Sequence, residues 1–151
     1  MKKLQFILAL ALLSPTVSGV SAGEKFAATN YYVTDTKTWL TGEKTGYWMT
    51  KFSGVSQVRH GPVDTLAVEC NGAGYWGTNG VSGNGICIHG TGDDTFVLRF
   101  EARPGAKANS WKILSGRGKY QGLIGEGTAT TNKLPGNRRV SKLIGEMEIR
   151  K

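Results

Sequence analysis

The sequence is short of the residues and motifs that identify an enzyme. Its 151 residues include two cysteines and two histidines, and no residue pattern in it specifies a reaction. Cys70 and Cys87 lack the close spacing of a CxxC pair, which argues against a zinc site formed by these cysteines with His60 and His89. We expect neither a metal nor another cofactor, and the sequence leaves open whether the protein is an enzyme.

Long apolar segments, linkers and internal repeats are also lacking beyond residue 22. Apolar residues make up 39% of the chain and charged residues 20%, which is typical of a single globular domain. No later segment has the roughly 20 apolar residues that a membrane-spanning helix needs. The 22 glycines follow no three-residue period, which excludes a collagen-like chain and leaves turns, bulges or close packing to explain them.

Residues 1–22 have the pattern of a signal peptide. Lys2 and Lys3 precede an apolar stretch at 4–13, and small residues at 20–22 fit a cleavage site. An uncleaved anchor is the alternative, but a polar Ser-Pro-Thr segment ends the apolar stretch well short of a span. We expect residues 23–151 to be the mature domain, periplasmic or secreted.

Export changes the interpretation of the two cysteines. In an oxidising compartment a Cys70–Cys87 disulfide is favoured, and closing that loop would stabilise the fold by roughly 3 kcal/mol. A zinc site and a reduced cysteine nucleophile with a histidine base remain as alternatives.

The mature chain alternates apolar and polar residues with a period of two. Phe96, Leu98 and Phe100 share one face of the segment 95–101, and the segment 142–150 repeats the pattern. Turn-forming residues such as Asn71-Gly72 and Pro104-Gly105 separate such segments. Further strands are predicted at 44–52, 53–59, 65–70, 81–89, 111–115 and 120–131. We therefore predict an all-β domain of about eight antiparallel strands, and the glycines at 116–127 favour a bent, closed barrel over a sandwich.

The segment 111–128 carries a family resemblance. Its Trp111, the Gly-x-Gly-x-Tyr of 116–120, Gly122 and the Gly-x-Gly of 125–127 resemble the pattern of allene oxide cyclase-like and dirigent-like barrels, including small exported bacterial proteins without an assigned activity. The resemblance implies an eight-stranded antiparallel barrel with an apolar interior. A lipocalin-like barrel is the alternative, although Thr38-Trp39-Leu40 lacks the Gly-x-Trp expected in the first strand of that family.

Such a barrel implies three functions. The first is binding of a small apolar molecule in the interior. The second, implied by the cyclases, is a cyclase or isomerase acting on an unsaturated or phenolic substrate, for which Glu126 and His89 are the candidate catalytic residues. The alternation of side chains along the strand does not decide whether Glu126 faces the interior. The alternative is that Glu126 lies on the solvated exterior of the barrel. Tyr75, Trp76 and Tyr120 are the candidate ligand-binding residues, with ordinary core packing as the alternative.

Two features of the sequence predict opposite orientations for the His89 side chain. Ile86 and Ile88 mark the opposite face as the core. A disulfide between adjacent strands would instead place Cys70, Cys87 and His89 together on the inner face. The sequence does not decide between them.

A basic surface suggests the third function, association with the cell envelope. The formal charge is +8, and it falls to +6 when Lys2 and Lys3 are removed. Such a charge favours anionic surfaces, but no nucleic-acid-binding motif accompanies it and no nucleic acid partner is expected. The oligomeric state is not predicted.

Overall fold

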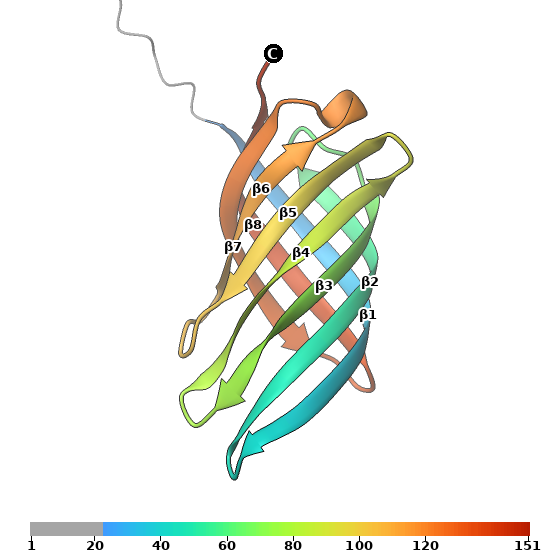
Figure 1. Cartoon of the computed structure of the whole chain (residues 1–151). Helices are drawn as coiled ribbons and strands as arrows, with labels where there is room; N and C mark the ends of the chain where they lie inside the picture. The colour runs from blue at the N-terminus through green and yellow to red at the C-terminus, as the bar shows by residue number, and fades with distance from the viewer. Residues whose placement is uncertain (1–22) are drawn as a thin grey trace, which may run out of the picture.

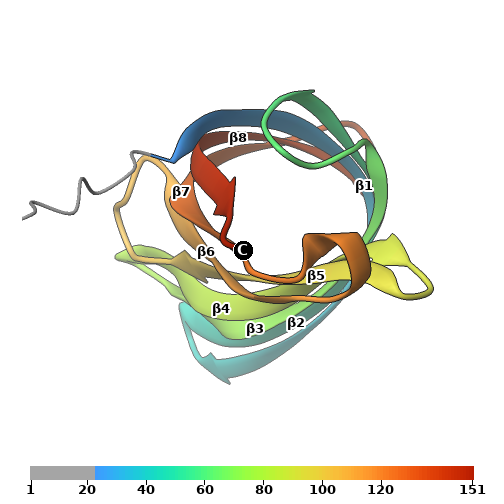
Figure 2. The same cartoon turned by 90° about the horizontal axis from the view of Figure 1, so that it is seen from above.

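Eight antiparallel strands form a single closed barrel in the computed structural model, which describes residues 23–151 (Figure 1). Each strand pairs with the next, and β8 pairs with β1 to close the ring (Figure 2). The elements are β1 (Glu24–Gly42), β2 (Thr45–His60), β3 (Leu66–Gly77), β4 (Gly80–Thr91), β5 (Asp94–Ala102), β6 (Asn109–Gly116), the 3-10 helix η1 (Gly118–Tyr120), β7 (Leu123–Lys133) and β8 (Arg138–Ile149). The predicted all-β fold and closed barrel are confirmed. The proposed signal peptide lies outside the described residues, among which no helix has the length and apolar character to cross a membrane.

The alternating segments of the sequence became strands with one face in the barrel. On β5, Phe96 and Leu98 are buried while Arg99 is exposed, and on β8 Leu143 and Met147 are buried while Lys142 is exposed. This is the expected outcome for strands whose side chains point alternately to the two faces of a sheet.

Several predicted boundaries differ from the structure. The strand predicted at 65–70 continues to Gly77 as β3, because Asn71 and Gly72 pair with both neighbouring strands instead of forming the predicted turn. The segments 44–52 and 53–59 form one strand, β2, because its pairing with both β1 and β3 continues without interruption across Phe52 and Ser53. The predicted strand at 120–131 begins three residues later, at Leu123. Gly122 has a φ of +79°, in the left-handed region, and this conformation ends the turn through η1 before extended pairing can begin.

The longest strand, β1, was not predicted from the sequence. Its inward side chains in the middle of the strand include Asn30, Thr34 and Thr36, which line or border the interior. Because both faces of β1 carry polar residues there, the strand has no apolar period to detect. Its polar inner face is the first sign that the barrel interior is not a uniform apolar core.

One end of the barrel is packed shut. Phe26, Phe96, Tyr120 and Met147 are buried there, and Val63 of the β2–β3 loop covers them. The Tyr120 ring meets the Phe96 ring edge-on with centroids 5.4 Å apart. Its hydroxyl lies 3.3 Å from a carboxylate oxygen of Asp64, which also binds Lys119 at 2.6 Å. That lysine hydrogen bond is the main reason why the pKa of Asp64 is lowered. We call this the closed end.

A tryptophan packed on glycines connects the closed end to the interior. The Trp111 ring lies over Gly127 of β7 and Gly145 of β8, which pair across the two strands. A Cβ at Gly127 would lie 2.6 Å from the Trp111 ring and closer still to the carbonyl oxygen of Ile144. The Trp111 indole donates a hydrogen bond to the Thr128 carbonyl at 3.0 Å. Gly127 of the resemblance motif and Gly145 outside it thus provide space for a ring.

Substitution of Gly127 tests this packing. Gly127→Ala should lower the free energy of unfolding by about 2 kcal/mol, because the added methyl group overlaps backbone as well as the ring. Thr128→Ala, on the exposed outer face of the same strand, is the matched control and should change it by less than about 0.5 kcal/mol. Denaturant unfolding followed by tryptophan fluorescence measures both. Equal stability of Gly127→Ala and the parent protein would contradict the close approach.

Candidate functional site

The rest of the barrel interior is a cavity of about 700 Å³. It runs from the buried core toward the turns opposite the closed end, where exposed Gly80, Gly105 and Ala106 border it. We call this opening the mouth. Six aromatic side chains line the cavity: Tyr32, Trp48, Phe52, Trp76, Phe100 and Trp111.

The aromatic rings lie along the wall because glycines stand behind them. A Cβ at Gly46 would lie 2.4 Å from the Trp76 ring, and one at Gly83 would lie 2.5 Å from the Trp48 ring. The Trp48 indole is fixed by a hydrogen bond of 3.2 Å to the Ser82 carbonyl. The wall is therefore aromatic while the space in front of the rings stays open.

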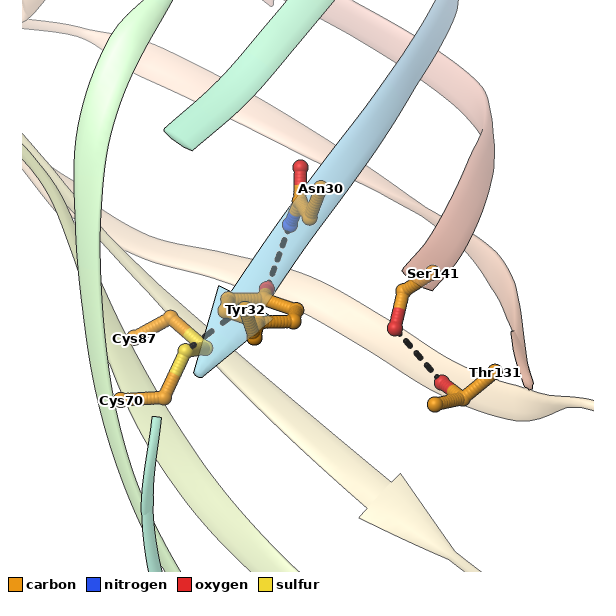
Figure 3. Close-up of a disulfide and its surroundings, with 6 residues drawn as sticks. All are labelled: Asn30, Tyr32, Cys70, Cys87, Thr131 and Ser141. Carbon is orange, nitrogen blue, oxygen red and sulfur yellow. Dashed lines mark hydrogen bonds between the residues drawn. A yellow bond between two sulfur atoms is a disulfide. The ribbon is translucent and has the colours of Figure 1, made fainter. Parts of the chain in front are cut away.

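The Cys70–Cys87 disulfide is part of the cavity wall and confirms the predicted pairing. The two cysteines are direct partners on β3 and β4, with Cα atoms 3.9 Å apart. Next to them, the Asn30 amide donates to the Tyr32 hydroxyl at 2.5 Å, and that hydroxyl lies 3.8 Å from Sγ of Cys70 (Figure 3). A disulfide sulfur has no proton, so Tyr32 is the donor in this second contact.

Tyr32 keeps its proton. Burial raises the pKa of Tyr32 to about 12, and the hydrogen bond from Asn30 opposes part of this effect. The hydroxyl is therefore neutral near neutral pH and remains able to donate. On the other side of the cavity, the Thr131 and Ser141 hydroxyls are 2.7 Å apart (Figure 3).

Two buried polar atoms of the wall have no hydrogen-bond partner within residues 23–151. They are Oδ1 of Asn30 and Nε2 of His89. Leaving a buried polar atom without a partner typically costs about 1–3 kcal/mol. Both residues belong to the cavity wall, so the wall contains two polar atoms whose hydrogen-bonding capacity is unused.

His89 faces the interior, which settles the facing that the sequence left open. Only 2% of its surface is exposed, and its ring stacks on Phe96 with centroids 4.6 Å apart. Ile86 and Ile88, on the other face of β4, are 48% and 50% exposed. Burial lowers the pKa of His89 to about 4, so the imidazole is neutral near neutral pH.

The structure separates the other predicted site residues. Trp76 lines the cavity, whereas its neighbour Tyr75 is 60% exposed on the outer face. Tyr120 is buried in the closed end and does not line the cavity. Glu126 is exposed on the outer face of β7, paired with Glu146 of β8. The cavity lining contains no Asp or Glu.

Asn30 and Tyr32 were not predicted as site residues, because the strand that positions them was not recognised from the sequence. Asn30, Tyr32, Thr34 and Thr36 do occupy alternate positions. These residues are polar or aromatic, so the alternation produces no apolar face. Within residues 23–151, no cluster of three or more His, Cys, Asp or Glu side chains is placed to hold a metal ion.

Comparison with known proteins supplies no further assignment. No protein-family model matches the chain, and no curated protein matches its sequence. The functional interpretation therefore depends on the geometry and chemistry of the cavity.

Proposed function

We propose that the protein binds a small, largely apolar molecule inside the barrel. The observation that carries the proposal is the cavity of about 700 Å³ with an aromatic wall and two buried polar atoms without partners, on Asn30 and His89. Ligand cavities in proteins commonly measure about 300–1,000 Å³ and combine an apolar lining with a few polar anchors. A largely apolar ligand with one hydrogen-bond donor and one further polar group would match this lining.

The polar groups define which ligand the cavity favours. Oδ1 of Asn30 is an acceptor, and the neutral imidazole of His89 can donate or accept according to its tautomer. With no carboxylate in the lining, a strongly cationic ligand would find no counter-charge. Arg103 and Arg139 also line the cavity, so a neutral or anionic molecule with one or two polar groups fits best.

Native mass spectrometry of the protein purified from its own host tests the proposal directly. A co-purifying mass that organic extraction removes would support it. Repeated isolation of the protein without such a mass, together with failure of hydrophobic probes to bind, would reject it.

A substitution that fills the cavity provides the matched test. Ala129 lines the cavity, whereas Ala67 is exposed on the outer face of β3. Ala129→Phe should weaken binding of the neutral fluorescent probe N-phenyl-1-naphthylamine at least about tenfold, because the new ring occupies the volume that the probe needs. Ala67→Phe adds the same ring outside and should leave the affinity unchanged. Equal affinities in fluorescence titrations of the two variants would place the probe elsewhere.

A cyclase or isomerase activity is the second candidate function, and His89 is the observation that favours it. A neutral imidazole in an apolar cavity can accept a proton or a hydrogen bond from a bound substrate. Glu126 lies on the outer face, so we base this alternative on His89 alone. Incubating the extracted ligand with the protein and with His89→Gln, then comparing products by chromatography, distinguishes turnover from binding.

We also propose that the chain is an exported, distant member of the allene oxide cyclase-like and dirigent-like barrels. The eight-stranded antiparallel barrel supports this proposal, as does the packing of Trp111 on Gly127 within the resemblance motif. The disulfide supports export, because such bridges persist in oxidising compartments.

A further inference from the structure

Positive charge is concentrated at the mouth of the barrel. Alternate turns of an antiparallel barrel lie at the same end, and four of them surround the mouth at the bottom of Figure 1. We define the rim as the segments 42–45, 77–80, 102–109 and 133–139. The basic residues of the rim are Lys44, Arg103, Lys107, Lys133, Arg138 and Arg139, and its one acidic residue is Glu43.

Most of these rim cations are not neutralised by the protein. Arg103 pairs with Glu101 at 2.9 Å, but the described residues provide no ion pair within 4 Å for the other rim cations. Asp35 of β1 lies in a crevice of about 450 Å³ that it shares with Lys133, Arg138 and Arg139. It leaves most of the positive charge of the rim uncompensated.

The closed end has a different charge arrangement. Its turns at 61–65, 91–94 and 116–122 carry two basic residues, Arg117 and Lys119, which form ion pairs with Asp93, Asp94 and Asp64. These turns therefore hold three acids and two bases, whereas the rim holds six basic residues and one acid. The barrel has an electrostatic polarity along its axis.

Exposed apolar side chains accompany the charges of the rim. Leu40, at the tip of the β1–β2 hairpin, is 77% exposed, and Val81 and Leu134 are exposed beside the neighbouring turns. Trp39 is also exposed, with its ring 5.9 Å from that of Tyr47 on the outer face of the hairpin. Basic residues with exposed tryptophan and leucine are typical of surfaces that lie at a membrane interface.

We infer that the rim docks on an anionic lipid bilayer, with the mouth of the barrel facing the headgroups. The rim cations meet lipid phosphates, and the apolar side chains of the hairpin tip enter the headgroup layer. If the proposed ligand binding holds, this orientation lets an apolar molecule pass between bilayer and cavity with little exposure to water.

Vesicle sedimentation tests the docking. The chain of residues 23–151 should bind vesicles containing phosphatidylglycerol at about 0.01 M salt, should bind more weakly at about 0.15 M, and should not bind phosphatidylcholine alone. The double reversal Lys107→Glu with Lys133→Glu should weaken binding at least about tenfold. The matched control, Lys142→Glu with Lys151→Glu, changes the net charge equally away from the rim and should retain most of the binding.

A second variant distinguishes binding to a bilayer from binding to a soluble polyanion. Leu40→Asn should reduce vesicle binding about tenfold, because it removes an apolar side chain from the headgroup layer, and it should leave retention on immobilised heparin unchanged. Equal loss in the two charge-reversal proteins would overturn the inference, as would heparin binding without vesicle binding. Probe binding in the cavity is measured without vesicles, so failure of docking is distinguishable from failure of ligand binding.

Discussion

Loss of the Cys70–Cys87 disulfide should lower the free energy of unfolding by about 3 kcal/mol. The bridge joins residues 17 apart in sequence, and a loop of this length restricts the unfolded chain by about that amount in the chain-entropy description. The two cysteines are already ladder partners on β3 and β4, so the barrel should still form without the bond. Guanidinium unfolding of the oxidised protein and of Cys70→Ala with Cys87→Ala measures the loss.

Chemical reduction provides a control with an unchanged sequence. The double alanine variant also removes two buried sulfur atoms that belong to the core cluster, whereas reduced parent protein retains them. Reduction should therefore account for most of the loss, and the alanine variant should lose somewhat more. Equal stability of the oxidised and reduced proteins would show that the bridge does not stabilise the barrel.

Stability should fall as the pH is lowered from about 6.5 to about 4, because His89 is buried in its neutral form. Burial lowers the pKa of His89 from 6.5 to about 4. Across that window the unfolded chain binds a proton that the folded chain does not, so the free energy of unfolding decreases as the pH falls. The full shift corresponds to about 3 kcal/mol. Denaturant unfolding at a series of pH values measures it.

A non-titrating variant isolates the contribution of His89. His89→Leu should lose most of the pH dependence between 6.5 and 4, whereas His60→Gln, which removes the exposed histidine, should retain it. Asp64 and Glu101 also have lowered pKa values. Their protonation therefore decreases the free energy of unfolding mainly at still lower pH. Parallel pH curves for His89→Leu and the parent protein would contradict a neutral buried imidazole.

The sequence predicted the strands whose inner face is apolar, and it failed where the cavity is polar. Phe96, Leu98 and Phe100 made β5 recognisable, because burial in the barrel requires an apolar period. β1 was missed because Asn30 and Thr36 face a cavity instead of a packed core. The strand missed in the sequence is therefore the one that carries Asn30 and Tyr32 of the candidate site.

The candidate site could be predicted only in part, for a related reason. On β4, isoleucines occupy the outer face and Cys87 with His89 the inner face, so hydrophobicity alone indicates the wrong side. The disulfide partner, not the apolar pattern, decides the facing. For Tyr75 and Trp76, extended geometry does predict that one ring faces in and the other out, but nothing local to the sequence specifies which.

The glycines behind the tryptophan rings determine how much open volume the barrel interior keeps. Gly46 and Gly83 border the rings of Trp76 and Trp48 from the wall side. At Gly46 the nearest atoms to an added methyl group all belong to the Trp76 ring, so the methyl group would displace that ring into the lumen, and the accessible volume would shrink although no lining residue had changed. If the barrel binds a ligand as proposed, the size of that ligand depends on a residue that it need not touch, and a relative with alanine or serine at this position would accept smaller molecules through an otherwise identical lining.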